Sequence, residues 1–114
     1  MARDGGLEEL LREEFGGLPG LSEKPMFGGW AFLLNGNLLC GAREDGMLVR
    51  LGKGNDGWAL ELPGVVQMIL GERAMQGWVR ADARVYGDDA LRKHLLNAAL
   101  DYVQTLQVKQ QDRT

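Results

Sequence analysis

The feature that most constrains the fold is a long apolar stretch, KPMFGGWAFLLNGNLLCG, at residues 24–41. It contains a glycine pair and a turn dipeptide. We predict a strand at residues 25–34 and its partner at residues 38–43, because Asn35-Gly36 between them is a favoured two-residue hairpin turn. The stretch therefore predicts an antiparallel hairpin at the centre of a sheet.

A third strand extends this hairpin into a meander. Asp45-Gly46 repeats the turn signal directly before the apolar residues 47–51. A glycine-rich loop then leads to a short helix that we expect at residues 57–62. Trp58 and Leu62 are the two large apolar side chains of this helix, and we expect both to be buried.

A second hairpin and two flanking helices complete the pattern. Strands are predicted at residues 65–70 and 73–81, because Gly71 suits the first position of a type II′ turn. The first helix shows helical spacing of apolar residues at Leu7, Leu10, Leu11 and Phe15. The last helix begins near Asp88 or Asp89, and its expected buried stripe is Leu91, Leu95, Ala98, Tyr102 and Leu106.

These elements predict an α+β fold with the order α-β(3)-α-β(2)-α. The two hairpin groups should form one antiparallel sheet with helices packed on a face, which makes a two-layer structure. The chain shows no internal repeat or linker, so we expect one domain over residues 1–114, with an ordered core at about 5–108.

Charge and cysteine content bear on the protein's binding partners and on its cellular compartment. The net charge of −3 argues against a nucleic-acid binder that works by bulk positive charge. Cys40 is the only cysteine, so an intrachain disulfide is excluded, which fits a reducing compartment. The N-terminus lacks an apolar signal core and the chain lacks an 18-residue apolar span, so we expect a cytoplasmic protein without membrane contact.

The sequence contains no motif that predicts a reaction. We find no metal-ligand cluster, no nucleophile–base pair and no complete phosphate loop, so we expect no enzyme, no cofactor and no small-molecule substrate. Gly28-Gly29 is followed by a strand rather than a helix, which favours a bulge or a close crossing over a phosphate site. His94 has no partner motif, and Cys40 is expected to behave as a small hydrophobe.

An interaction surface is the better hypothesis, because the first strand is apolar on both faces. Phe27, Ala31 and Leu33 point away from the face that carries Trp30 and Phe32. A two-layer fold covers one sheet face with helices, so the other face could form a dimer or partner interface. Alternatively, loops or the short helix could cover it.

Further candidates lie on later strands. Alternation puts Trp78 on one face with Gln76 and Arg80, opposite to Met75 and Val79. An exposed Trp beside Arg is typical of interaction hot spots, whereas coverage of both faces would make Trp78 a core residue.

Several arginines keep nucleic-acid binding open as an alternative function. Arg50 points opposite to its apolar neighbours and could receive an acidic partner or simply lie on the solvated sheet face. Arg43, Arg50 and Arg80 could gather on one face of the sheet, which would form a basic patch.

The chain resembles the TfoX N-terminal domain family over roughly residues 5–108. The most specific blocks are Met26-Phe27-Gly28-Gly29 and Gly77-Trp78-Val79, supported by Asn35-Gly36, Val49-Arg50 and Leu62-Pro63-Gly64. The resemblance implies a fold like that of type III secretion chaperones and YjbR-like proteins.

The same resemblance implies a function near the regulation of natural competence. The longer TfoX/Sxy regulators act with the cyclic-AMP receptor protein and carry a second, C-terminal domain, whereas the residues that match here correspond to the first domain. We therefore expect a non-enzymatic regulatory or protein-interaction domain, with a protein partner or a homodimer.

Overall fold

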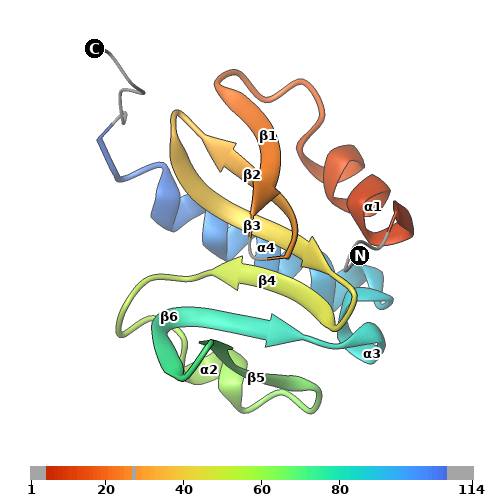
Figure 1. Ribbon diagram of the computed structural model, residues 1–114, viewed down its shortest axis with the longest axis vertical. Coiled ribbons are helices and arrows are strands. Elements are labelled where there is room, and N and C mark those ends of the chain that lie inside the picture. The colour runs from red at the N-terminus through yellow and green to blue at the C-terminus, as the bar shows by residue number, and fades with distance from the viewer. Residues whose placement is uncertain (1–4, 27, 108–114) are drawn as a thin grey trace.

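One antiparallel sheet of six strands forms the frame of the protein (Figure 1). The computed structural model describes residues 5–26 and 28–107. The elements in this part of the chain are α1 (Gly5–Phe15), β1 (Leu21–Met26), β2 (Gly29–Leu34), β3 (Asn37–Arg43), β4 (Gly46–Arg50), α2 (Gly57–Leu60), β5 (Val65–Leu70), β6 (Arg73–Ala81), α3 (Ala83–Tyr86) and α4 (Asp89–Val103). The α+β class and the single antiparallel sheet predicted from the sequence are confirmed.

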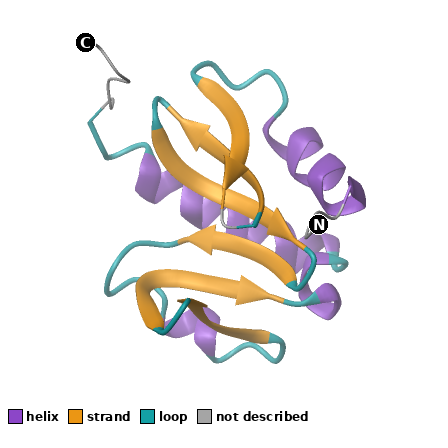
Figure 2. Ribbon diagram, in the orientation of Figure 1, coloured by secondary structure: helices purple, strands orange, loops and turns teal. Residues whose placement is uncertain are grey.

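The strand order is β1-β2-β3-β4-β6-β5, so β1 and β5 are the two edge strands. Every neighbouring pair is antiparallel. The helix α4 crosses behind β3 and β4, as Figure 2 shows, and it packs on both strands. The predicted helical layer on one sheet face is therefore present.

The predicted strand at residues 25–34 is wrong, because the apolar stretch folds into parts of two strands. The chain reverses after Met26, and β1 pairs with β2 so that Met26 lies opposite Gly29. Gly28, in the connection, has φ of +75°, a conformation that favours glycine. The sheet consequently has six strands where the sequence predicted five.

The turn chemistry of the other hairpins agrees with the sequence. Asn35 and Gly36 have φ of 52° and 84°, and two successive positive values are what a type I′ turn requires. Gly71 has φ of 65° at the first position of the β5–β6 turn, as a type II′ turn requires. Both predicted hairpin turns are therefore confirmed.

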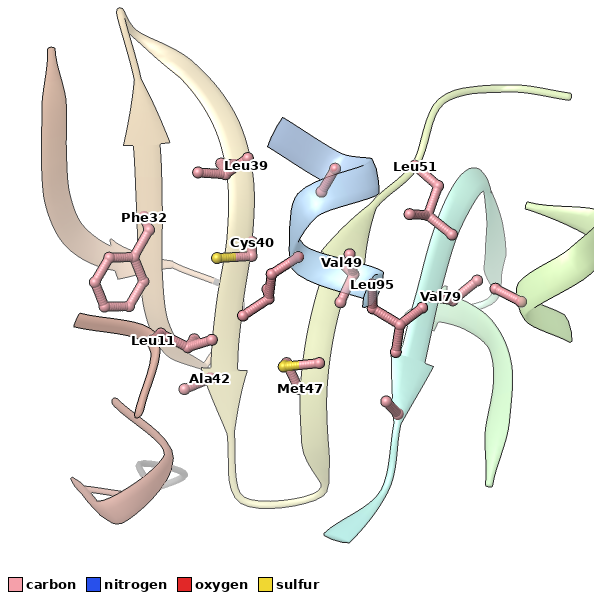
Figure 3. Close-up of a cluster of buried hydrophobic side chains, with 14 of the residues drawn as sticks. Leu11, Phe32, Leu39, Cys40, Ala42, Met47, Val49, Leu51, Val79 and Leu95 are labelled. Atoms are coloured by element: carbon pink, nitrogen blue, oxygen red, sulfur yellow. The ribbon is translucent and has the colours of Figure 1, made fainter. Parts of the chain in front are cut away.

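The main core lies between the sheet and the helices (Figure 3). Leu11 of α1 and Leu95 of α4 point into the layer of side chains from β2, β3, β4 and β6. These strands contribute Phe32, Leu39, Cys40, Ala42, Met47, Val49 and Val79, all of which are fully buried. Burial of these apolar side chains supplies the main driving force for folding.

The buried stripe of α4 differs by about one residue from the predicted one. The side chains that are buried are Arg92, Leu95, Leu96, Ala99 and Val103. Both stripes have helical spacing, and periodicity alone does not decide between neighbouring stripes on one helix. The predicted residues Leu91, Ala98, Tyr102 and Leu106 are partly buried at the flank of the core.

Short helices flank the second hairpin. The predicted cap of α4 is confirmed, because the side chain of Asp88 accepts a hydrogen bond from the Leu91 N–H at 3.0 Å. Asp82 caps the single-turn helix α3 in a similar way, and the sequence analysis missed this helix. None of the helices in residues 5–26 and 28–107 is long and apolar enough to cross a membrane.

Candidate interaction surface

The structure buries two of the side chains that were candidates for an exposed surface. Trp78 is 6% exposed and Leu33 is 5% exposed. The hypothesis of an exposed Trp beside Arg is therefore wrong, and the alternative, in which Trp78 is a core residue, is confirmed. Phe27, a further candidate, lies outside the described residues.

Trp78 is buried because other apolar side chains cover the sheet face on which it lies, opposite to Val79. Gly77 has φ of +85°, so the strand does not continue with simple alternation at this point. Trp78 packs with Leu48 of β4 and Met68 of β5 in a second, smaller core, and Met75 packs against it. The predicted separation of Trp78 from Met75 on opposite faces is wrong, because alternation assumes an unbent strand.

The candidate arginines contact acceptors within the protein. Arg43 donates two hydrogen bonds to the Asp45 carboxylate, at 2.9 and 2.6 Å, and holds the pKa of Asp45 below its usual value. Arg80 donates to the Asp45 backbone oxygen at 3.0 Å. Arg50 donates to the Leu38 backbone oxygen at 3.1 Å. Gln76, a further candidate, is exposed.

The contacts of Arg43 and Arg80 brace the turn between β3 and β4, and Arg50 binds at the other end of this strand pair, so the three do not form an open basic patch. The guanidinium of Arg50 also lies over the ring of Tyr102, 5.7 Å from the ring centroid. The Asp45 carboxylate offsets the charge of Arg43 and lies 3.8 Å from Arg80. The geometry therefore adds no support to the nucleic-acid alternative.

The glycine pair of the apolar stretch has a structural explanation. A Cβ on Gly29 would collide with the backbone oxygen of Ala42 on β3. The close crossing predicted for this pair is thus confirmed for Gly29, while Gly28 supplies the turn. Nothing in this arrangement resembles a helix N-terminus that could hold a phosphate.

Cys40 lies in the main core, whereas His94 lies on the surface of α4. Cys40 is fully buried in the main core, and burial raises the pKa of its thiol well above its usual value. His94 lies exposed on α4 and stacks on Trp58, with the ring centroids 4.5 Å apart and the ring planes 18° from parallel. Trp58 was expected to be buried, and that prediction is wrong.

The exposed apolar side chains of the described residues gather in one segment that sequence reasoning did not single out. They are Trp58, Leu60, Val66, Ile69 and Leu70. All lie on α2, on β5 or directly beside them, and α2 packs against β5 (Figure 1). We call these five residues the α2–β5 surface. Exposed apolar side chains that gather on neighbouring elements in this way are typical of an interaction site.

A signal for this surface was present in the sequence. The strand β5 reads VVQMIL and contains no charged residue, whereas it lies at the edge of the sheet. Hairpin patterns alone gave its secondary structure but not its place in the strand order. Without that order, an uncharged strand is equally consistent with the sheet centre, where both faces are covered.

A groove of about 760 Å³ lies between α4 and the loop that precedes α2. Trp58, Asn55, Asp101, Tyr102 and Thr105 contribute to its lining. Among the described residues, none of the side chains singled out from the sequence as an interaction candidate lines it. In residues 5–26 and 28–107, His, Cys, Asp and Glu side chains form no group of three that could hold a metal ion.

Comparison with models of protein families matches the TfoX N-terminal domain over residues 13–103. The match covers most of the 114 residues, and it includes all six strands. No curated protein and no solved structure matches the chain.

Proposed function

The chain belongs to the TfoX N-terminal domain family, and from this membership we propose that it is a non-enzymatic regulatory domain that works by binding a protein partner. The binding site in this proposal is the α2–β5 surface rather than the sheet face around Trp78. The family resemblance supports, for this proposal, a role near the regulation of natural competence.

The observation that carries the proposal is the gathering of exposed apolar side chains on one segment. Ile69 is 54% exposed and Val66 is 46% exposed, although both belong to a strand of the sheet. Scattered exposed apolar residues are normal in soluble proteins. Clustered ones leave apolar area in water, and a partner that buries this area gains free energy of association. The α2–β5 surface has this clustered character.

The surface also has the chemistry of an interface core. It combines an aromatic side chain, Trp58, with the aliphatic residues Leu60, Val66, Ile69 and Leu70. Interface cores are depleted in charged residues and enriched in aromatic ones. Trp58 is held in place by its stacking on His94, so a partner would meet it already oriented.

Affinity purification from the native host tests this function. The wild-type chain would be compared with Ile69→Lys, which puts a charge on the surface, and with Gln104→Lys, which adds the same charge at an exposed position at the end of α4. We expect Ile69→Lys to lose a partner that Gln104→Lys retains. Recovery of the same proteins with both variants would overturn the proposal.

A further inference from the structure

We infer that the outer edge of β5 pairs with the β5 edge of a second copy of this chain, in antiparallel orientation, to form one continuous sheet across a two-fold axis. This inference rests on the α2–β5 surface of the proposed function and names its partner. An edge strand presents a row of backbone N–H and C=O groups that can pair with another strand.

The two edges of the sheet differ in a way that supports this assignment. The edge strand β1 reads LSEKPM and carries Glu23, Lys24 and Pro25. Charges and proline are the devices by which proteins prevent edge-to-edge pairing. The edge strand β5 contains neither a charge nor a proline, so it lacks this protection.

The composition of β5 favours a second copy as the partner. An uncharged apolar strand is best paired by another uncharged apolar strand, because a charged strand would lose the solvation of its charges. Of the two edges, only β5 offers such a strand, so β5 is its own complement. Antiparallel pairing of identical strands is compatible with the two-fold symmetry that is commonest among oligomers.

Exposure indicates the register. Met68 faces the small core with Trp78, and the register of β5 against β6 shifts at this residue. Val66 and Leu70 lie two residues to either side of it. Placing the two-fold axis at Met68 puts the exposed Val66 of one copy opposite the exposed Leu70 of the other. The same register puts Ile69 opposite Gln67 on the other face.

The helix α2 enlarges this contact beyond the strand itself. The exposed Leu60 belongs to α2, which packs against β5, whereas Trp58 of the same helix stacks on His94 of α4. Two copies related by the axis would bring both α2 segments to the same side of the extended sheet. Contacts by side chains outside the paired strands increase the buried area toward that of a specific interface.

Sedimentation velocity over a roughly hundredfold range of protein concentration tests the inference directly. The wild-type chain should shift toward twice the monomer mass of 12.6 kDa as concentration rises. Ile69→Lys and Val66→Lys should each weaken association at least about tenfold, because each leaves a charge in the interface. Gln104→Lys should associate like the wild type. Circular dichroism would verify that every variant is folded.

Two outcomes separate this inference from the proposed function. A folded wild type that stays monomeric at every concentration, while Ile69→Lys loses a host partner, would overturn the self-pairing and leave the partner-binding function intact. A dimer that Ile69→Lys does not weaken would also overturn it. Amide hydrogen exchange gives a positive check, since protection at residues 66–70 should rise with protein concentration.

A cross-linking experiment tests the register. Cys40 is buried and is the only cysteine, so a cysteine introduced at an exposed position is the accessible thiol. A mixture of Val66→Cys and Leu70→Cys chains should form a disulfide dimer under mild oxidation, several-fold faster than either variant alone. Equal rates in the mixture and in the separate variants would overturn the register.

Discussion

Gly77 of β6 crosses Gly52 so closely that a Cβ on Gly77 would lie 2.6 Å from the Gly52 carbonyl carbon. The Gly77 carbonyl oxygen accepts hydrogen bonds from the N–H groups of Leu51 and Gly52, at 2.7 and 3.1 Å. This crossing fixes the bend in β6. Directly after the bend, Trp78 packs in the small core with Leu48 and Met68.

The substitution Gly77→Ala should therefore destabilise the fold by about 3 kcal/mol, since it combines a positive φ with a collision against backbone. Gly54→Ala is the matched control, because Gly54 has φ of +86° but no atom within 4 Å of a built Cβ. It should cost only about 1 kcal/mol. Urea denaturation of both variants measures the difference, and equal midpoints would contradict this account of the bend.

The substitution Trp78→Ala should act on stability rather than on a partner. Truncation of a buried Trp leaves a large cavity and costs about 3–5 kcal/mol. Ile69→Ala, on the exposed strand edge, should change the stability of the monomer by less than about 1 kcal/mol. Thermal or urea denaturation at low protein concentration checks both values. A Trp78→Ala chain with wild-type stability would show that Trp78 is not a core residue.

Glu23 should make the stability depend on pH in the acidic range. Hydrogen bonds from Arg12, at 2.7 and 3.0 Å, hold the pKa of Glu23 below its usual value of 4.5. A carboxylate with a lowered pKa in the folded state stabilises the fold above its unfolded pKa, and the stabilisation is lost as pH falls through the folded pKa.

Glu23→Gln should cost about 1 kcal/mol at neutral pH, a modest value because the pair is partly exposed. The difference from the wild type should shrink as the pH falls below 4.5. Glu9→Gln is the control, because the Glu9 carboxylate contacts the same Arg12 at 3.0 Å but is largely exposed. A free-energy difference for Glu23→Gln that stays constant with pH would contradict the role of this ion pair.

Cys40 should be inert in the folded protein. Burial raises the pKa of its thiol and excludes reagents, whereas thiolates are the reactive species. A colorimetric thiol reagent at mildly alkaline pH should label the native chain only as fast as the chain unfolds, and should label it at once in urea. Because the chain has one cysteine, the signal reports this position alone. Fast labelling without denaturant would contradict the burial.

The sequence predicted well those parts of the fold that depend on local signals, such as turns and helix caps. Asn35-Gly36 and Gly71 marked their hairpin turns, and Asp88 marked the start of α4, because each acts on neighbouring backbone. The family was also recognisable, since its motif residues are spread along the strands and turns. These features need no knowledge of which elements meet in space.

Long-range features were the part that the sequence did not predict. The strand β1 was missed because its charges and proline are typical of loops, although an edge strand tolerates them. The burial of Trp78 depends on side chains of β4 and β5 that cover its face, which alternation within one strand does not show. The exposure of Ile69 depends on strand order, so the candidate surface shifted from the β6 face to β5.

The proline and charges on β1 also set the stoichiometry of any assembly built on the sheet. A strand added at β5 extends the sheet in one direction only, because β1 at the far end resists a further addition. Each chain is monofunctional in the sense used for polymers: one sheet edge, β5, can add a strand, and the other edge, β1, is blocked. Under the proposed pairing of β5, such units would combine in pairs and stop, so an exposed apolar strand could persist in this fold without leading to fibres.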